Sequence, residues 1–209
     1  MTALSEQQLE TLSEICRYGA ADASDALSKW LGREIRVLVE NVEQATLEVT
    51  TELLGPADTT VCVCCMRVTG GVNGQLLLGF DDASGLMLCD ALLSRETPAT
   101  EWGELEMSAA METTNIVGCA FLNALAKVYP ASTHHLGDAD EPSWIPTPPV
   151  FVRDFAASIM QFALVDQTCA FDQVLIAKTQ FTIDGTPIGW RLLLIPDAES
   201  LERMARIMP

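Results

Sequence analysis

Two segments of this 209-residue chain repeat one helical layout, and the repeat limits the folds that the chain can adopt. Glu112 lies 98 residues after Glu14. The same spacing relates three further identical pairs: Ala26 and Ala124, Leu27 and Leu125, and Lys29 and Lys127. Self-similarity at a fixed spacing is typical of duplicated structural units. The sequence therefore predicts two copies of one long helix.

A second pair of similar segments follows the two copies of the helix. Leu76-Leu-Leu-Gly-Phe-Asp81 and Leu192-Leu-Leu-Ile-Pro-Asp197 both read as an apolar strand that runs into a helix. The order helix, strands, strand, helix thus recurs, which predicts a duplicated unit of roughly 100 residues. We expect an α/β fold of the α+β type, in which two pseudo-symmetric halves form one antiparallel sheet with both long helices exposed on one side. A single domain should span 1–209, with halves at about 1–95 and 100–209.

Capping and turn signals place the elements. Ser5 with Gln8 resembles a capping box and Gly32 is a stop signal, so a helix should run from Ser5 to about Trp30. The remaining expected elements are strands at 34–41, 58–68 and 73–80, helices at 81–93 and 101–128, a polar break at 95–100, a loop at 129–149, strands at 150–164, 170–183 and 188–195, and a terminal helix at 198–207. Residues 44–54 are consistent with either a strand or a short helix.

The charge balance limits the partners of the chain. Twenty-nine acidic and 12 basic residues give a formal net charge of −17, which repels phosphate backbones and anionic membrane surfaces. We therefore expect neither nucleic acid nor membrane as a partner. The sequence has no 18-residue apolar run and starts without an export-signal pattern, so we expect a cytoplasmic protein.

The seven cysteines are expected to be reduced thiols packed as small hydrophobic groups. The run Val61-Cys-Val-Cys-Cys-Met66 lacks a Cys-x-x-Cys pair, and strand alternation turns Cys64 and Cys65 to opposite faces, so it predicts a structural strand. His134 and His135 are adjacent and are not suited to chelate one ion together. No metal site of the chain's own is predicted.

Ser108, Glu112 and Asn115 form a stripe on the second long helix. At 100° per residue they fall within about 60° of each other. The broad opposite side carries small and apolar residues: Ala109, Ala110, Val117, Phe121, Ala124 and Leu125. Such a stripe is commonly just a solvated face, but a glutamate retained in both copies favours a shared role at the surface.

At these residues the chain resembles the CheC/CheX/FliY family, which comprises bacterial phosphatases of the chemotaxis response regulator CheY. The family motif is Asp or Ser, three residues, Glu, two residues, Asn, and the stripe fits it at each position. Within the family the resemblance is strongest to CheC. It covers nearly the whole chain, including Ala26 to Arg33, the Asn115-Ile116 helix and the segment from Leu192 to Leu201.

The resemblance implies hydrolysis of an aspartyl phosphate carried by a CheY-type partner. Asn115 would orient the attacking water and Glu112 would meet the partner's lysine, with Ser108 and Glu14 as partner-binding residues. The chemistry suits an amide, because phosphoryl transfer depends mainly on positioning and an amide both donates and accepts hydrogen bonds. No cofactor of its own is implied, since the partner would supply Mg²⁺.

The first copy departs from the motif, because Glu10 and Arg17 replace the leading residue and the amide. We expect Arg17 to pair with Glu14 and this copy to be inactive, although it could still bind a protein. If the long helices are related by pseudo-symmetry, Arg17→Asn with Glu10→Ser should restore a water-orienting amide.

The spacing to the next prolines also departs from the family pattern. The family usually has a proline some two dozen residues beyond the asparagine, whereas in the Pro-rich segment here Pro142, Pro146, Pro148 and Pro149 follow Asn115 by 27, 31, 33 and 34 residues. An enlarged loop explains the difference, and its Trp144 is either an anchor of the loop or a partner contact, with the anchor favoured.

A non-catalytic adaptor is the alternative function. Such a protein would bind a receiver domain or the deamidase CheD without accelerating hydrolysis. The intact Ser108, Glu112 and Asn115 favour the enzyme, while Glu10, Glu14 and Arg17 in the first copy show that the fold can drift from the motif.

Overall fold

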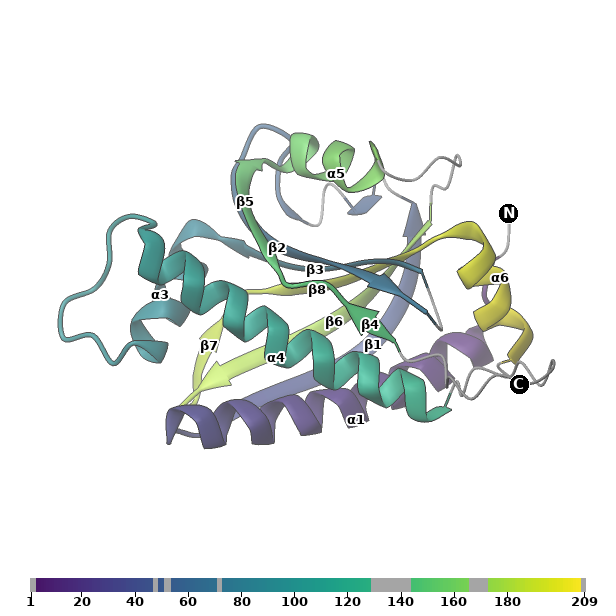
Figure 1. Cartoon of the computed structure of the whole chain (residues 1–209), viewed down its shortest axis with the longest axis horizontal. Coiled ribbons are helices and arrows are strands. Elements are labelled where there is room, and N and C mark those ends of the chain that lie inside the picture. The colour runs from purple at the N-terminus through teal and green to yellow at the C-terminus, as the bar shows by residue number, and fades with distance from the viewer. Residues whose placement is uncertain are drawn as a thin grey trace.

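One antiparallel sheet organises the chain in the computed structural model, which describes residues 3–46, 49–50, 54–70, 73–128, 144–165 and 173–207 (Figure 1). The strands follow the order β1-β6-β8-β3-β2-β4, while β5 also pairs with β2 and β7 with β6. The strands are β1 (Ile35–Thr46), β2 (Thr60–Thr69), β3 (Gly74–Asp81), β4 (Ile145–Pro146), β5 (Val150–Phe155), β6 (Gln173–Ile183), β7 (Thr186–Ile188) and β8 (Arg191–Pro196). The helices are α1 (Glu6–Leu31), α3 (Asp82–Leu92), α4 (Glu104–Val128), α5 (Ala156–Val165) and α6 (Ala198–Ile207).

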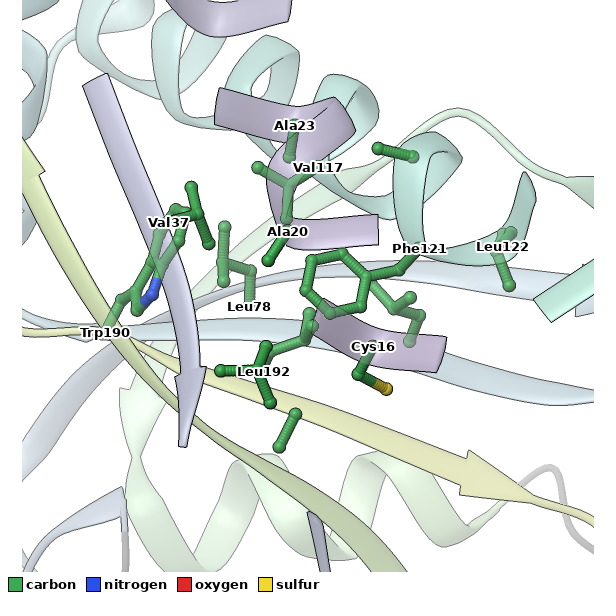
Figure 2. Packing of buried hydrophobic residues seen from close by; sticks show 14 of the residues in the cluster. Cys16, Ala20, Ala23, Val37, Leu78, Val117, Phe121, Leu122, Trp190 and Leu192 are labelled. Atoms are coloured by element: carbon green, nitrogen blue, oxygen red, sulfur yellow. The ribbon is translucent and has the colours of Figure 1, made fainter. Parts of the chain in front are cut away.

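The two long helices, α1 and α4, pack together over one face of the sheet, and α5 covers the other face (Figure 1). A small residue permits the close approach of α1 and α4: a Cβ on Gly19 would lie 2.9 Å from the Cα of Phe121. Figure 2 shows the resulting core, in which Ala20 and Phe121 from the helices face Leu78 and Leu192 from the sheet. The predicted placement of both long helices on one side is confirmed.

The two halves interleave within the sheet. Exchanging β1 with β5, β2 with β6 and β3 with β8 reproduces the order β1-β6-β8-β3-β2-β5 in reverse. The register of the central pair has the same property, because Leu76 pairs with Leu194, Leu77 with Leu193 and Leu78 with Leu192. The strand order is therefore the one expected of a duplicated unit, while the duplication itself and a twofold relation between the atoms of the halves stay predictions.

Local capping signals explain where the helices begin. Ser5 and Gln8 form the predicted capping box, and Gly32 ends α1 with a left-handed φ of 65°. Asp81 accepts a hydrogen bond from the Ser84 amide at 2.8 Å at the start of α3. Asp197 and Ser200 repeat this contact at 2.7 Å at the start of α6. The predicted helices at 5–30, 81–93, 101–128 and 198–207 are confirmed.

Three expectations about elements change. The predicted strand at 150–164 ends at Phe155 and continues as α5. The apolar run after Phe155 does not distinguish strand from helix by its sequence, and the amides of Ala156 and Ala157 donate to backbone carbonyls at Thr59 and Ala57, which starts the helix. Of the predicted loop at 129–149, residues 145–146 form β4, and 129–143 lie outside the described residues. The ambiguous segment 44–54 continues β1 to Thr46 and is helical at 49–50.

The described cysteines are free thiols, as predicted. Cys64 faces the helix-covered core, whereas Cys65 packs against the cluster on the other face. Burial raises the pKa of the Cys64 thiol to about 12, so it stays protonated. Cys169, His134 and His135 lie outside the described residues.

In the part of the chain that the structure describes, no helix combines the length and the apolar character needed to cross a membrane.

Candidate functional site

The predicted stripe lies on the solvent side of α4. Ser108 and Glu112 are exposed and Asn115 is half-buried. The opposite side of the helix is buried, as the periodicity predicts, through Ala109, Ala110, Val117, Phe121, Ala124 and Leu125. The structure thus brings Ser108, Glu112 and Asn115 together on one face, while Glu14 lies on α1, outside this stripe.

An open groove of about 430 Å³ runs beside the stripe. Its other wall is the proline strap, residues 144–149. The groove is lined by Ser108, Met111, Glu112 and Asn115 from α4 and by Pro146, Thr147, Pro148 and Pro149 from the strap. We call it the α4 groove. One wall offers a carboxylate, an amide and a hydroxyl, and the other is mainly apolar.

The proline strap is tied to the sheet at several points. Trp144 is buried in the core at 8% exposure, which supports its interpretation as an anchor. Ile145 and Pro146 pair with the end of β2. The amide of Thr147 donates to the Arg67 carbonyl at 2.8 Å, and the Thr147 hydroxyl accepts from the Arg67 amide at 3.0 Å. The second wall of the α4 groove is therefore held in place.

Buried contacts hold α4 itself at its start and its middle. Near the start, the buried carboxylate of Glu106 pairs with Arg95 and accepts a hydrogen bond from the Gly103 amide at 3.1 Å. In the middle, a Cβ on Gly118 would lie 2.8 Å from the Met66 sulfur of β2. The stripe therefore stands on a helix that is fixed against the sheet.

Asn115 has a partner one helical turn further on. The Cys119 thiol donates to its Oδ1 with a sulfur-to-oxygen distance of 3.7 Å. Burial, and secondly the charge of Glu112, raise the pKa of the Cys119 thiol above its usual range. Within the described residues Glu112 has no ion-pair partner, and no group of three His, Cys, Asp or Glu side chains is placed to hold a metal ion. The groove thus offers polar contacts but no built-in metal centre in this part of the chain.

The corresponding residues on α1, which are Glu10, Glu14 and Arg17, make different contacts. Arg17 pairs with Glu10 at 3.0 Å and donates to the Glu40 carbonyl of β1, also at 3.0 Å. The expected pair of Arg17 with Glu14 is therefore wrong. The guanidinium reaches Glu10 and the strand at the same time, and Glu14 stays exposed.

Serines on α1 cover the outer edge of β1. Hydroxyl oxygens of three of them accept backbone N–H groups of the strand. The pairs are Ser13 with Val42 at 2.8 Å, Ser24 with Val37 at 2.8 Å and Ser28 with Ile35 at 3.0 Å. Applying the 98-residue spacing, α4 has Met111, Leu122 and Ala126 at these places, so it lacks the hydroxyl acceptors.

Sequence reasoning missed two parts of the site. It did not identify the proline strap as a wall, because the strap approaches α4 only in the folded chain. It also gave Cys119 no role, although the position carries a detectable signal: at 100° per residue Cys119 falls inside the same stripe of about 60°.

Comparison with known proteins places the fold. No family model matches the chain. The sequence is 20% identical over 207 residues to the CheY-P phosphatase CheC of Bacillus subtilis (strain 168), covering 96% of this chain and 93% of that protein. The structure matches FliY of Thermotoga maritima with a TM-score of 0.75 and 18% identity, covering 99% and 98% of the two chains. It matches the FliM middle domain of H. pylori with a TM-score of 0.68 and 16% identity, covering 98% and 100%.

Proposed function

Because the chain belongs to the CheC/CheX/FliY family, we propose that it is a chemotaxis phosphatase that hydrolyses the aspartyl phosphate of a CheY-type response regulator. The observation that carries the proposal is that the three residues of the family motif, Ser108, Glu112 and Asn115, line one wall of the α4 groove. The groove is open, as a site for a protein substrate must be. The reaction would take place in the cytoplasm.

Asn115 is the proposed catalytic residue. Its amide has two N–H donors and an oxygen with two lone pairs, so it can hold a water in line with the phosphorus atom. A carboxylate at this place would repel the phosphoryl oxygens. The chemistry needs little more from this chain, since positioning and charge stabilisation supply most of the acceleration and the Mg²⁺ belongs to the partner.

Glu112 is proposed to dock the partner. It is exposed one turn before Asn115 and is unpaired among the described residues, so it is available to the partner's lysine. The formal charge of −17 would also favour approach of a basic surface. Ser108 is the proposed peripheral contact at the far end of the stripe.

The rival function is a non-catalytic adaptor that binds a receiver domain or CheD. The arrangement of α1 favours it, because Glu14 is exposed there while Arg17 has no amide to place a water. An adaptor would bind the receiver and leave the lifetime of its phosphate unchanged.

The test is loss of labelled phosphate from a panel of phosphorylated receivers, with and without the chain. We expect Asn115→Ala to reduce the acceleration by about 100-fold or more, as when a single group that stabilises a transition state is removed. Asn115→Asp should do no better. Asn123→Ala is the matched control, because Asn123 is exposed on the same helix but does not line the groove.

Wild-type turnover in Asn115→Ala or Asn115→Asp on the cognate receiver contradicts the proposed catalytic role. Binding of a receiver by the wild-type chain with no acceleration on any member of the panel supports the adaptor instead. Circular dichroism of each variant separates loss of catalysis from loss of fold.

A further inference from the structure

We infer that Cys119 is a positioning residue for Asn115, which fixes the orientation of the amide in the α4 groove; the inference rests on the proposed function of that site. The contact that carries it is the hydrogen bond from the Cys119 thiol to Asn115 Oδ1 at 3.7 Å. Both side chains are half-buried on one exposed stripe, one helical turn apart. The family motif does not include the position of this cysteine.

The bond has a directional consequence. The end of an asparagine side chain rotates about a soft torsion, so an amide at a surface samples several orientations. A donor fixed to Oδ1 selects the orientation in which this oxygen points toward Cys119. The two N–H donors and the second lone pair of Oδ1 stay free for a water and for phosphoryl oxygens. Holding a reacting group in one orientation lowers the entropic part of the barrier.

The chemistry of the thiol suits a donor. Cys119 acts here only as S–H, since a thiolate has no proton to give to Oδ1. Burial and the nearby Glu112 carboxylate both disfavour the thiolate and raise the pKa of Cys119. The glutamate that is proposed to dock the partner thus adds to the effect of burial in favouring the protonated thiol.

The first half lacks both members of the pair. At the 98-residue spacing, Arg17 stands in place of Asn115 and Ala21 in place of Cys119. The amide and the thiol are therefore present together on α4 and absent together from α1.

The test compares Cys119→Ala, which removes the donor, with Cys119→Ser, which keeps one. With the cognate receiver we expect Cys119→Ala to lower kcat about tenfold at unchanged KM, because the amide is misoriented and the docking surface is intact. Cys119→Ser should stay within about twofold of wild type, because its hydroxyl can still donate to Oδ1. Cys65→Ala is the matched control, a half-buried thiol packed on the other face of the sheet.

A second readout is independent of activity. The NMR order parameter of the Asn115 side-chain NH₂ group should be high in the wild type, fall in Cys119→Ala and recover in Cys119→Ser. An order parameter that stays high in Cys119→Ala overturns the inference, and so does a kcat that is unchanged in that variant or equally lowered in Cys119→Ser. If no receiver is dephosphorylated by the wild type, the proposed function fails, while the order parameters still decide whether Cys119 orients Asn115.

Discussion

The long helices α1 and α4 share one layout but use their polar residues differently. On α1, Arg17 contacts the neighbouring strand and serines at three places cover its free edge. On α4, Glu112 and Asn115 face an open groove whose other wall is the proline strap. The first arrangement uses polar side chains to satisfy backbone groups, and the second leaves them available to a partner.

The hollow beside α1 and the α4 groove differ in the same way, because only the α4 groove is lined by the glutamate of its helix. A hollow of about 450 Å³ lies beside α1, but it begins at Arg17 and continues toward Asp25. Neither Glu10 nor Glu14 lines it. A duplicated helix can thus keep its fold and its glutamate while it loses the surface that would make the glutamate useful.

The largest expected effect concerns the transfer of the motif to α1. Pseudo-symmetry alone predicts that Arg17→Asn with Glu10→Ser, made in the Asn115→Ala background, restores hydrolysis. The structure leads us to expect background activity instead, at least about 100-fold below wild type. The reason is that, within the described residues, β1 and not a proline strap lines the hollow beside α1, and that Ala21 stands in place of Cys119. Receiver dephosphorylation measures it, and clear recovery in a folded variant would show that Arg17 and Glu10 alone silence this half.

Removing one serine hydroxyl from each helix tests whether α1 uses its polar side chains for stability while α4 leaves them free. Ser13 is buried at 1% exposure and accepts from the Val42 amide, so Ser13→Ala leaves that amide without its acceptor. We expect a loss of about 2 kcal/mol in the free energy of unfolding. Ser108 is exposed, and Ser108→Ala should change the free energy of unfolding by less than about 0.5 kcal/mol. Urea unfolding of both variants measures the difference, and equal losses would remove the distinction between the helices.

Charge reversal at the two glutamates tests which helix docks the receiver. Glu112→Lys should raise the Kd for a receiver that carries a stable phosphate analogue roughly tenfold, with little change in stability. The reason is that the reversed charge at residue 112 repels the partner's lysine. Glu14→Lys should have a smaller effect, since Glu14 does not line the hollow beside α1. Titration calorimetry at low salt, where charge effects are largest, measures both. An equal effect at Glu14 would assign a docking role to α1, and no effect at Glu112 would remove its role.

The smallest expected effect is a pH-dependent contribution to stability at the start of α3, which is compared with the start of α6. Asp82 accepts two hydrogen bonds from Arg153, at 3.0 and 2.6 Å, whereas the corresponding place in α6 is Ala198. Mainly the bond from Arg153 lowers the pKa of Asp82 from 3.8 to about 2. The stabilisation is therefore present above pH 3.8 and is lost as the pH falls toward 2.

The comparison of wild type with Asp82→Asn measures this contribution by urea unfolding between pH 2 and pH 6. The difference in stability should be constant above the ordinary pKa of the carboxyl and shrink below it. A difference that does not change with pH would show that the ion pair contributes nothing that depends on ionisation.

Much of the local structure could be predicted from the sequence. The capping box at Ser5 and Gln8 and the stop at Gly32 place α1 within one residue of its observed ends. The exposure of Ser108 and Glu112 follows from helical periodicity alone. The conformation of the apolar run after Phe155 could not be predicted, because its sequence does not distinguish a strand from a helix. Backbone hydrogen bonds to Ala57 and Thr59 contribute to the start of the helix there.

The candidate site shows why the remainder required the folded chain. The repeat and the motif specify which side chains stand on one face of α4, since that depends only on the 3.6-residue period of a helix. The partner of Arg17, the edge covered by Ser13 and the wall formed by the proline strap all depend on segments distant in the sequence. Their positions follow from the packing of the whole sheet, whose register no single segment encodes. Local periodicity thus determined the chemistry on the helix, and tertiary packing decided whether that chemistry faces a strand or an open groove.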